Sequence, residues 1–134
     1  MPHARWSALA LAENVPQIRQ AVVDFADANG ITEARARDIS LAISEAVTNA
    51  VVHAYRRHVH PGSVTVSATT EGAWIELRVV DDGIGIAPRN DSPGLGLGLP
   101  LIYRLADQVE LRRLPGEGTE LWMRFRGSKP TTLP

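Results

Sequence analysis

The stretch Ile39-Ser-Leu-Ala-Ile-Ser-Glu-Ala-Val-Thr-Asn-Ala-Val-Val-His-Ala-Tyr55 decides the fold. On a helix of about 100° per residue, one broad face collects the apolar side chains of Ile39, Ile43, Val47, Ala50 and Ala54, as a face that packs on a core should. The opposite face interleaves polar and apolar side chains: Asp38, Leu41, Glu45, Thr48, Asn49 and Val52, with His53 at its edge. A face that met only water would not need Leu41 and Val52.

Glu45 and Asn49 are the polar pair of greatest chemical interest on that second face. They are four residues apart, so their side chains lie one above the other and can reach a single point outside the helix. A carboxylate above a carboxamide can hold a divalent cation through oxygen, or can orient a hydroxyl while accepting its proton. The alternative is a surface pair that contacts only water, which is the commoner meaning of an isolated E-x-x-x-N spacing. The remaining motifs must decide between them.

Length and composition narrow the range of functions. A chain of 134 residues suits one domain with a two-layer core. The formal net charge of -1 favours neither nucleic acid nor an anionic membrane as a direct partner. The absence of cysteine excludes disulfides and a cysteine nucleophile. No apolar run has the length of a membrane span and no signal peptide is visible, so we expect a cytoplasmic protein.

Lysine is almost missing. Of the 14 basic residues only Lys129 is a lysine, and it lies in a Ser/Pro/Thr-rich tail. A P-loop lysine and a Schiff-base lysine are therefore both disfavoured. Any phosphate would have to be held by backbone amides, arginines or a metal.

Periodicity predicts the order of helices and strands. The expected elements are a strand over 4–11, a helix from Asn14 to a stop at Asn29-Gly30, a helix from a cap at Thr32 to about Arg57, a hairpin of strands 63–70 and 73–80, a helix after Gly94–Gly98, and a hairpin of strands 109–114 and 119–126. Mostly antiparallel, amphipathic strands with helices able to cover one face give an α+β fold, a two-layer α/β sandwich, over residues 1–126. Residues 127–134 are expected to be a disordered tail.

Asp81 stands where a strand should end, and Gly83 and Gly85 follow at two-residue spacing. A carboxylate in this position can accept a hydrogen bond from an exocyclic amine, while glycines let a flat ring approach the main chain. The simpler interpretation is a turn made by Asp-Gly.

A second glycine cluster comprises Gly94, Gly96 and Gly98, before the third predicted helix. Free amides at a helix start, together with the helix dipole, favour a phosphate. The G-x-G-x-G spacing after a loop is not the dinucleotide fingerprint. A flexible hinge is an equally good interpretation of the cluster taken alone.

Taken in order, four motifs resemble the N, G1 and G2 boxes and the closing Gly-Thr of the GHKL ATP-binding superfamily. They are Glu45-Ala-Val-Thr-Asn49-Ala-Val-Val-His53, Asp81-Asp-Gly83-Ile-Gly85-Ile86, Gly94-Leu95-Gly96-Leu97-Gly98-Leu-Pro-Leu-Ile and Gly118-Thr119. The match is closest to its anti-sigma-factor serine/threonine kinases, the bacterial switch kinases. The resemblance implies the Bergerat-type fold, with a mostly antiparallel sheet and helices on one face.

The resemblance also implies roles for these residues. Glu45 would be the general base and catalytic residue, and Asn49 would hold Mg²⁺. Asp81 would bind the adenine amine of ATP, with Gly83, Gly85 and Ile86 around the base and Thr119 supporting the adenine end. Gly94, Leu95, Gly96, Leu97 and Gly98 would close over the phosphates. His53 matches the N-box pattern without an assigned duty.

The function implied by the resemblance is that of an ATP-dependent protein serine/threonine kinase and anti-sigma factor. It would phosphorylate an anti-anti-sigma (STAS-domain) partner and, as a homodimer, sequester a sigma factor. The alternative is a nucleotide-sensing module that binds a partner and transfers little or no phosphate. The catalytic piece of a histidine kinase is less favoured, because no phosphoacceptor helix pair fits before Ile39.

Overall fold

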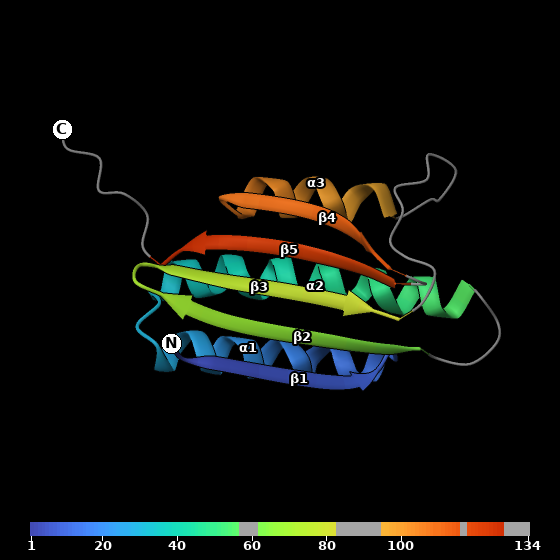
Figure 1. Cartoon of the computed structure of the whole chain (residues 1–134), viewed down its shortest axis with the longest axis horizontal. Coiled ribbons are helices and arrows are strands. Elements are labelled where there is room, and N and C mark those ends of the chain that lie inside the picture. The colour runs from blue at the N-terminus through green and yellow to red at the C-terminus, as the bar shows by residue number, and fades with distance from the viewer. Residues whose placement is uncertain (57–61, 83–94, 116–117, 128–134) are drawn as a thin grey trace.

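The chain folds into two layers, an antiparallel sheet and a layer of helices on one of its faces (Figure 1). The computed structural model describes residues 1–56, 62–82, 95–115 and 118–127, without the side chains of 53–56 and 95–98. The elements are β1 (His3–Leu9), a 3-10 turn (Ala12–Asn14), α1 (Val15–Ala28), α2 (Glu33–Arg56), β2 (Ser63–Glu71), β3 (Trp74–Asp81), α3 (Leu95–Leu105), β4 (Gln108–Leu114) and β5 (Gly118–Arg126). The predicted α+β sandwich is confirmed.

The sheet has five strands in the order β1-β2-β3-β5-β4, and every neighbouring pair is antiparallel. Both predicted hairpins are present, as β2–β3 and β4–β5. The first hairpin turns at Gly72, whose φ of 59° is a left-handed conformation that glycine adopts without strain. The central pair is β3 and β5, with Asp81 opposite Thr119 at one end and Trp74 opposite Arg126 at the other.

The helix ends follow local chemistry, with one correction. Gly30, at φ 80°, ends α1 as predicted. The Thr32 hydroxyl accepts a hydrogen bond of 3.3 Å from the Arg35 amide, the predicted cap of α2. The side chain of Asn14 makes no cap contact to α1. Its Nδ2 instead donates to the Leu9 carbonyl at 2.8 Å, because a 3-10 turn precedes the helix and brings Asn14 back to the end of β1.

The core lies between the sheet and the layer of helices, with α2 contributing the largest share of the buried helical residues. Ile39, Ile43 and Val47 are fully buried, as their spacing predicts. The sheet contributes alternate residues that point to the helices, among them Val66, Leu77, Leu121 and Phe125. Burial of this apolar surface is the main stabilising term of the fold. Among the described residues no helix is long and apolar enough to cross a membrane.

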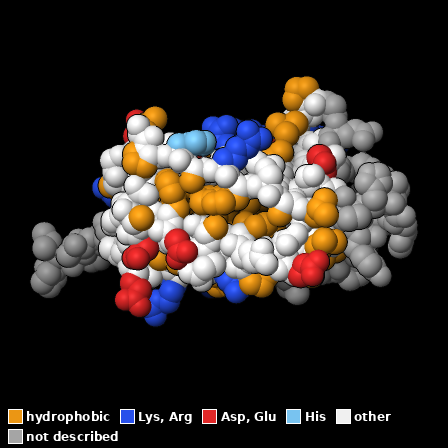
Figure 2. All heavy atoms as spheres, turned by 90° about the horizontal axis from the view of Figure 1, so that it is seen from below, with side chains coloured by type: hydrophobic (Ala, Val, Ile, Leu, Met, Phe, Trp, Pro, Cys, Tyr) orange, Lys and Arg blue, Asp and Glu red, His pale blue; other side chains and the backbone are white. Residues whose placement is uncertain are grey.

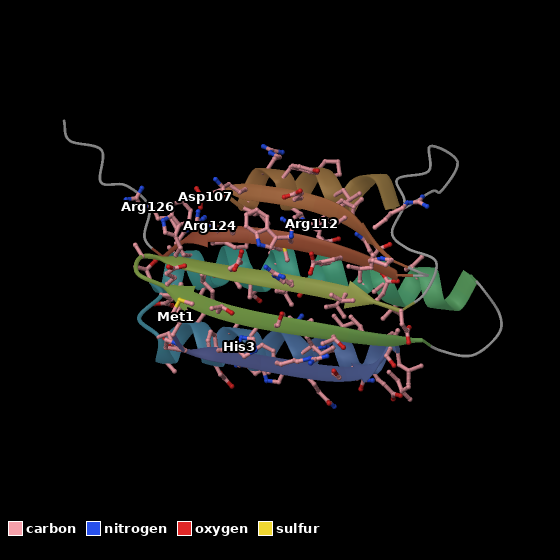
Figure 3. The ribbon with its side chains drawn as sticks, in the orientation of Figure 1. Met1, His3, Asp107, Arg112, Arg124 and Arg126 are labelled. Atoms are coloured by element: carbon pink, nitrogen blue, oxygen red, sulfur yellow. The ribbon has the colours of Figure 1, made fainter. Side chains whose placement is uncertain are left out.

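Arg35, only 4% exposed, joins three elements at one end of the molecule. Its guanidinium donates to Asp38 of α2 at 2.7 Å and to Asp107 at 2.6 Å. It also donates to the carbonyls of Leu105 (3.2 Å) and Arg126 (2.9 Å). Asp107 in turn accepts the Arg126 amide at 2.7 Å, and these two residues lie close together in Figure 3. The cluster ties the start of α2 to the ends of α3 and β5.

The uncovered face of the sheet carries charged and aromatic side chains (Figure 3). The Arg124 guanidinium lies 4.2 Å from the centre of the Trp74 ring, and that of Arg112 lies 5.4 Å from Trp122. Trp122 Nε1 donates to Glu76 on β3. These contacts cover the indole rings with polar groups, so this face is less apolar than its composition indicates.

Gly127 follows β5, at the start of the segment expected to be the tail. Its carbonyl accepts the Thr32 amide at 3.2 Å, and its own amide donates to the carbonyl of Ala73. The chain is therefore held in place as far as Gly127, and residues 128–134 lie outside the described part.

Candidate functional site

Four element ends meet at one end of the sandwich. The C-terminal half of α2, the end of β3, the start of β5 and the start of α3 all lie toward the right of Figure 1. Helix α2 packs against both β3 and β5, and α3 packs against α2. This convergence brings the N-box motif, Asp81, Thr119 and the two described glycines of the second cluster, Gly96 and Gly98, to one end of the fold.

Asn49 is buried to 4% exposure, although the helical spacing placed it on the face opposite the core. It lies on the flank of α2 beside the buried stripe, since α2 is covered by the sheet and by α3 as well. Its Nδ2 is buried, and within the described residues this atom has no hydrogen-bond partner. A buried polar group left in this state costs about 1–3 kcal/mol. A ligand that accepts from this group would recover that cost.

Glu45 lies one helical turn before Asn49 and is partly exposed. Both side chains therefore project along the same flank of α2, with Glu45 nearer to solvent. Leu41, one turn further back, is 44% exposed. The second face of α2 thus runs from an exposed leucine to a buried carboxamide.

Asp81 and Thr119 lie directly opposite each other on β3 and β5. Both are buried, with exposures of 4% and 2%. They occupy the last helix-side position at this end of their strands, in the same alternation as the core residues Val79 and Leu121. A carboxylate and a hydroxyl side by side at a strand end form a polar floor on the helix side of the sheet.

Gly118 precedes Thr119 and has a steric reason to be glycine. A Cβ at this position would lie 3.1 Å from the Asp81 carbonyl oxygen and 3.4 Å from Leu114 Cδ1. The start of β5 can therefore approach the Asp81 backbone closely. The sequence contains the Gly-Thr motif, and the register of β3 and β5 supplies the steric reason for its glycine.

Asp82 was given no role from the sequence. Its Oδ1 accepts the Ser63 amide at 2.8 Å, and its own amide donates to the Ser63 carbonyl at 3.3 Å. Asp82 therefore closes the open end of the β2–β3 hairpin and holds the strand end that carries Asp81. An aspartate beside a strand end is a common turn-forming residue, which is the signal that could have identified it.

Several predicted site residues lie outside the described part of the chain. They are Gly83, Gly85, Ile86 and Gly94. The backbone of Leu95, Gly96, Leu97 and Gly98 is described, as is that of His53, but their side chains are not. Helix α3 begins at Leu95, so Gly96 and Gly98 lie within its first turns and not before it, which corrects the expected position of the helix start.

The amides of a first helical turn are free to bind an anion. The described site therefore combines a buried carboxamide, a partly exposed carboxylate, a buried aspartate–threonine pair and a helix start. The Asn49 carboxamide and the Glu45 carboxylate are candidate oxygen ligands for a hard divalent cation such as Mg²⁺. The arrangement suits a nucleotide, with a polar contact for the base at the strand ends and amides for the phosphates.

Comparison with known proteins bears on this interpretation. A model of the histidine kinase-like ATPase domain matches residues 8–125. The anti-sigma F factor of Clostridium acetobutylicum is 32% identical over 127 residues, covering 87% of this chain and 87% of that protein. The anti-sigma F factor of Pasteuria penetrans is 33% identical over 123 residues, covering 84% and 82%.

A solved structure shares the fold. The RsbU and RsbW domains of a Mycobacterium tuberculosis protein match with a TM-score of 0.74 at 24% identity, over 94% of this chain and 32% of that one. The predicted GHKL resemblance and fold are therefore confirmed. Because the family model spans most of its length, this chain belongs to the histidine kinase-like ATPase domain family.

Proposed function

We propose that the chain binds ATP with Mg²⁺ and acts as a protein serine/threonine kinase and anti-sigma factor. The observation that carries the proposal is Asn49, a buried carboxamide whose Nδ2 has no partner within the described residues. Asn49 belongs to α2, which packs against β3 and β5, the two strands that carry Asp81 and Thr119. The similarity to anti-sigma F factors supports the regulatory part of the proposal.

Asp81 and Thr119 are proposed to bind the adenine. A buried carboxylate accepts a hydrogen bond from the exocyclic amine, and the neighbouring hydroxyl either donates or accepts beside it. Gly118 lets the strand start lie close to this floor. Gly83, Gly85 and Ile86 remain predicted contacts of the base.

Asn49 is proposed to present its carboxamide oxygen to Mg²⁺, with Glu45 one turn away to accept the proton of the attacking hydroxyl. A carboxamide can turn either its oxygen or its nitrogen to a ligand, so the buried Asn49 group fits a cation as well as a phosphate oxygen. When bound, the cation neutralises phosphate charge. The first turn of α3, with Gly94 to Gly98, supplies amides to the phosphates.

Phosphoryl transfer needs positioning and charge neutralisation more than covalent chemistry. A site with one carboxylate, one carboxamide and helix-start amides is therefore sufficient without lysine. We propose that the acceptor is a serine or threonine of a STAS-domain anti-anti-sigma protein. We further propose that a homodimer of the chain sequesters the sigma factor and works in the cytoplasm.

The nucleotide site is tested by isothermal titration of the purified protein with ATP and Mg²⁺, repeated on Asn49→Ala. We expect the substitution to weaken binding of ATP with Mg²⁺ roughly 10- to 100-fold, the size of effect that follows when a buried polar contact to a charged group is lost. Asn29→Ala is the matched control, because Asn29 donates to the Phe25 carbonyl at the opposite end of the helix layer. Equal binding by both variants would refute the assignment of Asn49.

Kinase activity is tested separately with Glu45→Ala. Phosphorylation of a STAS-domain protein should be lost while ATP binding is retained, because the carboxylate acts on the hydroxyl and not on the nucleotide. Regulation of the partner that is unchanged in Glu45→Ala would favour the alternative, a nucleotide-sensing module that transfers no phosphate.

A further inference from the structure

The proposed nucleotide site contains two carboxylates, Glu45 and Asp81, although ATP itself is strongly negative. Such a ligand binds better with cations nearby, and Mg²⁺ supplies only part of the compensation. The one lysine, Lys129, lies outside the described residues, so a permanently charged side chain from the described part would be an arginine. Figure 2 shows the β1 and α1 side of the molecule, where basic side chains lie near the middle and acidic and hydrophobic ones lie toward the site end on the right.

Arg113 on β4, at the other edge of the sheet, lies in the same cross-strand row as the proposed adenine contacts. It is opposite Thr119 on β5, and Thr119 is opposite Asp81 on β3. Directly opposite residues of antiparallel strands project from the same face, with their Cβ atoms about 4.5–5.5 Å apart. Arg113 therefore projects from the helix side of the sheet, as Thr119 and Asp81 do. It lies two strand spacings, about 10 Å, from Asp81.

The alternation along β4 gives the same orientation. Val109 and Leu111 occupy the preceding positions on this side of the strand, and both are partly buried and pack against the core. Arg113 follows them in the alternation but is exposed, at the second-last position of β4. A charged side chain thus replaces an apolar one where this strand reaches the site.

The guanidinium of Arg113 differs from that of its neighbour in its contacts. Arg112 projects from the other face of the sheet and donates to Glu110 at 2.7 Å and to Glu120 at 3.2 Å. Within the described part of the chain, Arg113 makes no comparable side-chain hydrogen bond or ion pair. Its donors are therefore available to a ligand.

The position of α3 indicates which part of the nucleotide Arg113 would meet. Helix α3 packs against α2 and β4, and it begins at the end of the sheet where β4 finishes (Figure 1). A nucleotide with its base at Asp81 and its phosphates at the first turn of α3 therefore runs from β3 across β5 toward β4. Arg113 lies on the phosphate side of the base along this path.

We propose that Arg113 binds a phosphate group of the nucleotide through its guanidinium. The inference rests on the proposed ATP site and adds to it a residue that lies outside the four sequence motifs. Arginine suits this task because its planar fork can donate two parallel hydrogen bonds to phosphate oxygens. Its long side chain keeps the charge hydrated while no nucleotide is bound.

The test compares ATP with adenosine in Arg113→Gln, which keeps a polar side chain but removes the charge. In isothermal titration, ATP with Mg²⁺ should bind about tenfold more weakly than to the wild type. This is the lower part of the range for a hydrogen bond to a charged group, because Arg113 is exposed. Ligand-observed NMR should show adenosine binding within about twofold of the wild type, since adenosine has no phosphate. Ionic strength of about 1 M should reduce the difference for ATP, because salt screens exposed charges.

Arg112→Gln is the matched control, because Arg112 is the adjacent arginine and projects from the opposite face. It loses two ion pairs, so urea unfolding of both variants ensures that folded proteins are compared. Its affinity for ATP should stay within about twofold of the wild type. Arg113→Lys should recover part of the ATP affinity, since lysine keeps the charge but not the two parallel hydrogen bonds.

Each outcome decides a separate question. If Arg113→Gln binds ATP as the wild type does, the inference is overturned, and Arg113 is only an inward-pointing charge that protects an edge strand from pairing. Equal losses for ATP and adenosine would place the guanidinium on the base and overturn its assignment to a phosphate. An equal loss of ATP affinity in Arg112→Gln would also overturn the inference, because the effect would then belong to the strand and not to the side chain. A wild type that binds no ATP refutes the proposed function, and the inference with it.

Discussion

Asp81→Asn is the sharpest test of the proposed adenine contact. The substitution preserves the shape of a side chain that is 4% exposed, but it replaces one carboxylate oxygen by an NH₂ donor. If that oxygen accepts the adenine amine, the variant brings two donors face to face in a buried place. The penalty for such an unmatched buried group is about 1–3 kcal/mol, which corresponds to a loss of affinity of roughly 5- to 150-fold.

The assay is isothermal titration with ATP and Mg²⁺, accompanied by urea unfolding of the same preparations. Asp82→Asn is the matched control, because Asp82 is adjacent and exposed, and its Oδ1, which accepts the Ser63 amide, can be kept as the amide oxygen of asparagine. We expect that control to bind ATP within about twofold of the wild type. An unchanged affinity in Asp81→Asn, with normal unfolding, would remove Asp81 from the site and refute the reasoning.

Two further predictions concern stability. Arg35→Met should lower the free energy of unfolding by about 3 kcal/mol and the melting temperature by about 10 °C, because the substitution leaves Asp38 and Asp107 without their buried cation. The control Arg37→Met, on the exposed side of α2, should change the free energy of unfolding by less than about 0.5 kcal/mol. Equal effects of the two substitutions in calorimetry would contradict the role given to the Arg35 cluster. The hydrogen bond from Arg112 lowers the pKa of Glu110 below 4.5, so the carboxylate stabilises the fold above that pH and the contribution disappears as the pH falls through the lowered value. The free energy of unfolding in urea should therefore be slightly lower for Glu110→Gln than for the wild type at neutral pH, and equal to it in strong acid. A difference between the two proteins that grows as the pH falls would contradict this assignment.

The sequence was sufficient for the order and type of every strand and α-helix, but not for the 3-10 turn Ala12–Asn14, because the apolar periods are clear in the longer elements and a three-residue turn has none. Ile39, Ile43 and Val47 predicted the buried face of α2, and the alternation in β3 and β5 predicted the sheet. Helix ends were less certain. Asn14 is a residue type that often caps helices, but its side chain turns to the Leu9 carbonyl instead of to the start of α1.

The site was predicted only in part, for a physical reason. Helical spacing placed Asn49 on the face opposite the core, whereas packing of α3 and the sheet buries it. Burial by a third element is a long-range property that no local pattern contains. The same applies to Gly118, whose close approach to the Asp81 carbonyl depends on the register of β3 and β5.

The Arg35 cluster has a consequence for the order in which the chain is made. Three of its acceptors lie 70, 72 and 91 residues later in the chain. Domains emerge at about 5–20 residues per second during synthesis, so Arg35 precedes its last acceptor by roughly 5–20 s. The guanidinium must stay hydrated through that interval, since a buried cation without acceptors is strongly unfavourable. The start of α2 therefore cannot complete its packing until the final strand has left the ribosome, so the last part of the chain to be made is also the part that completes the Arg35 cluster.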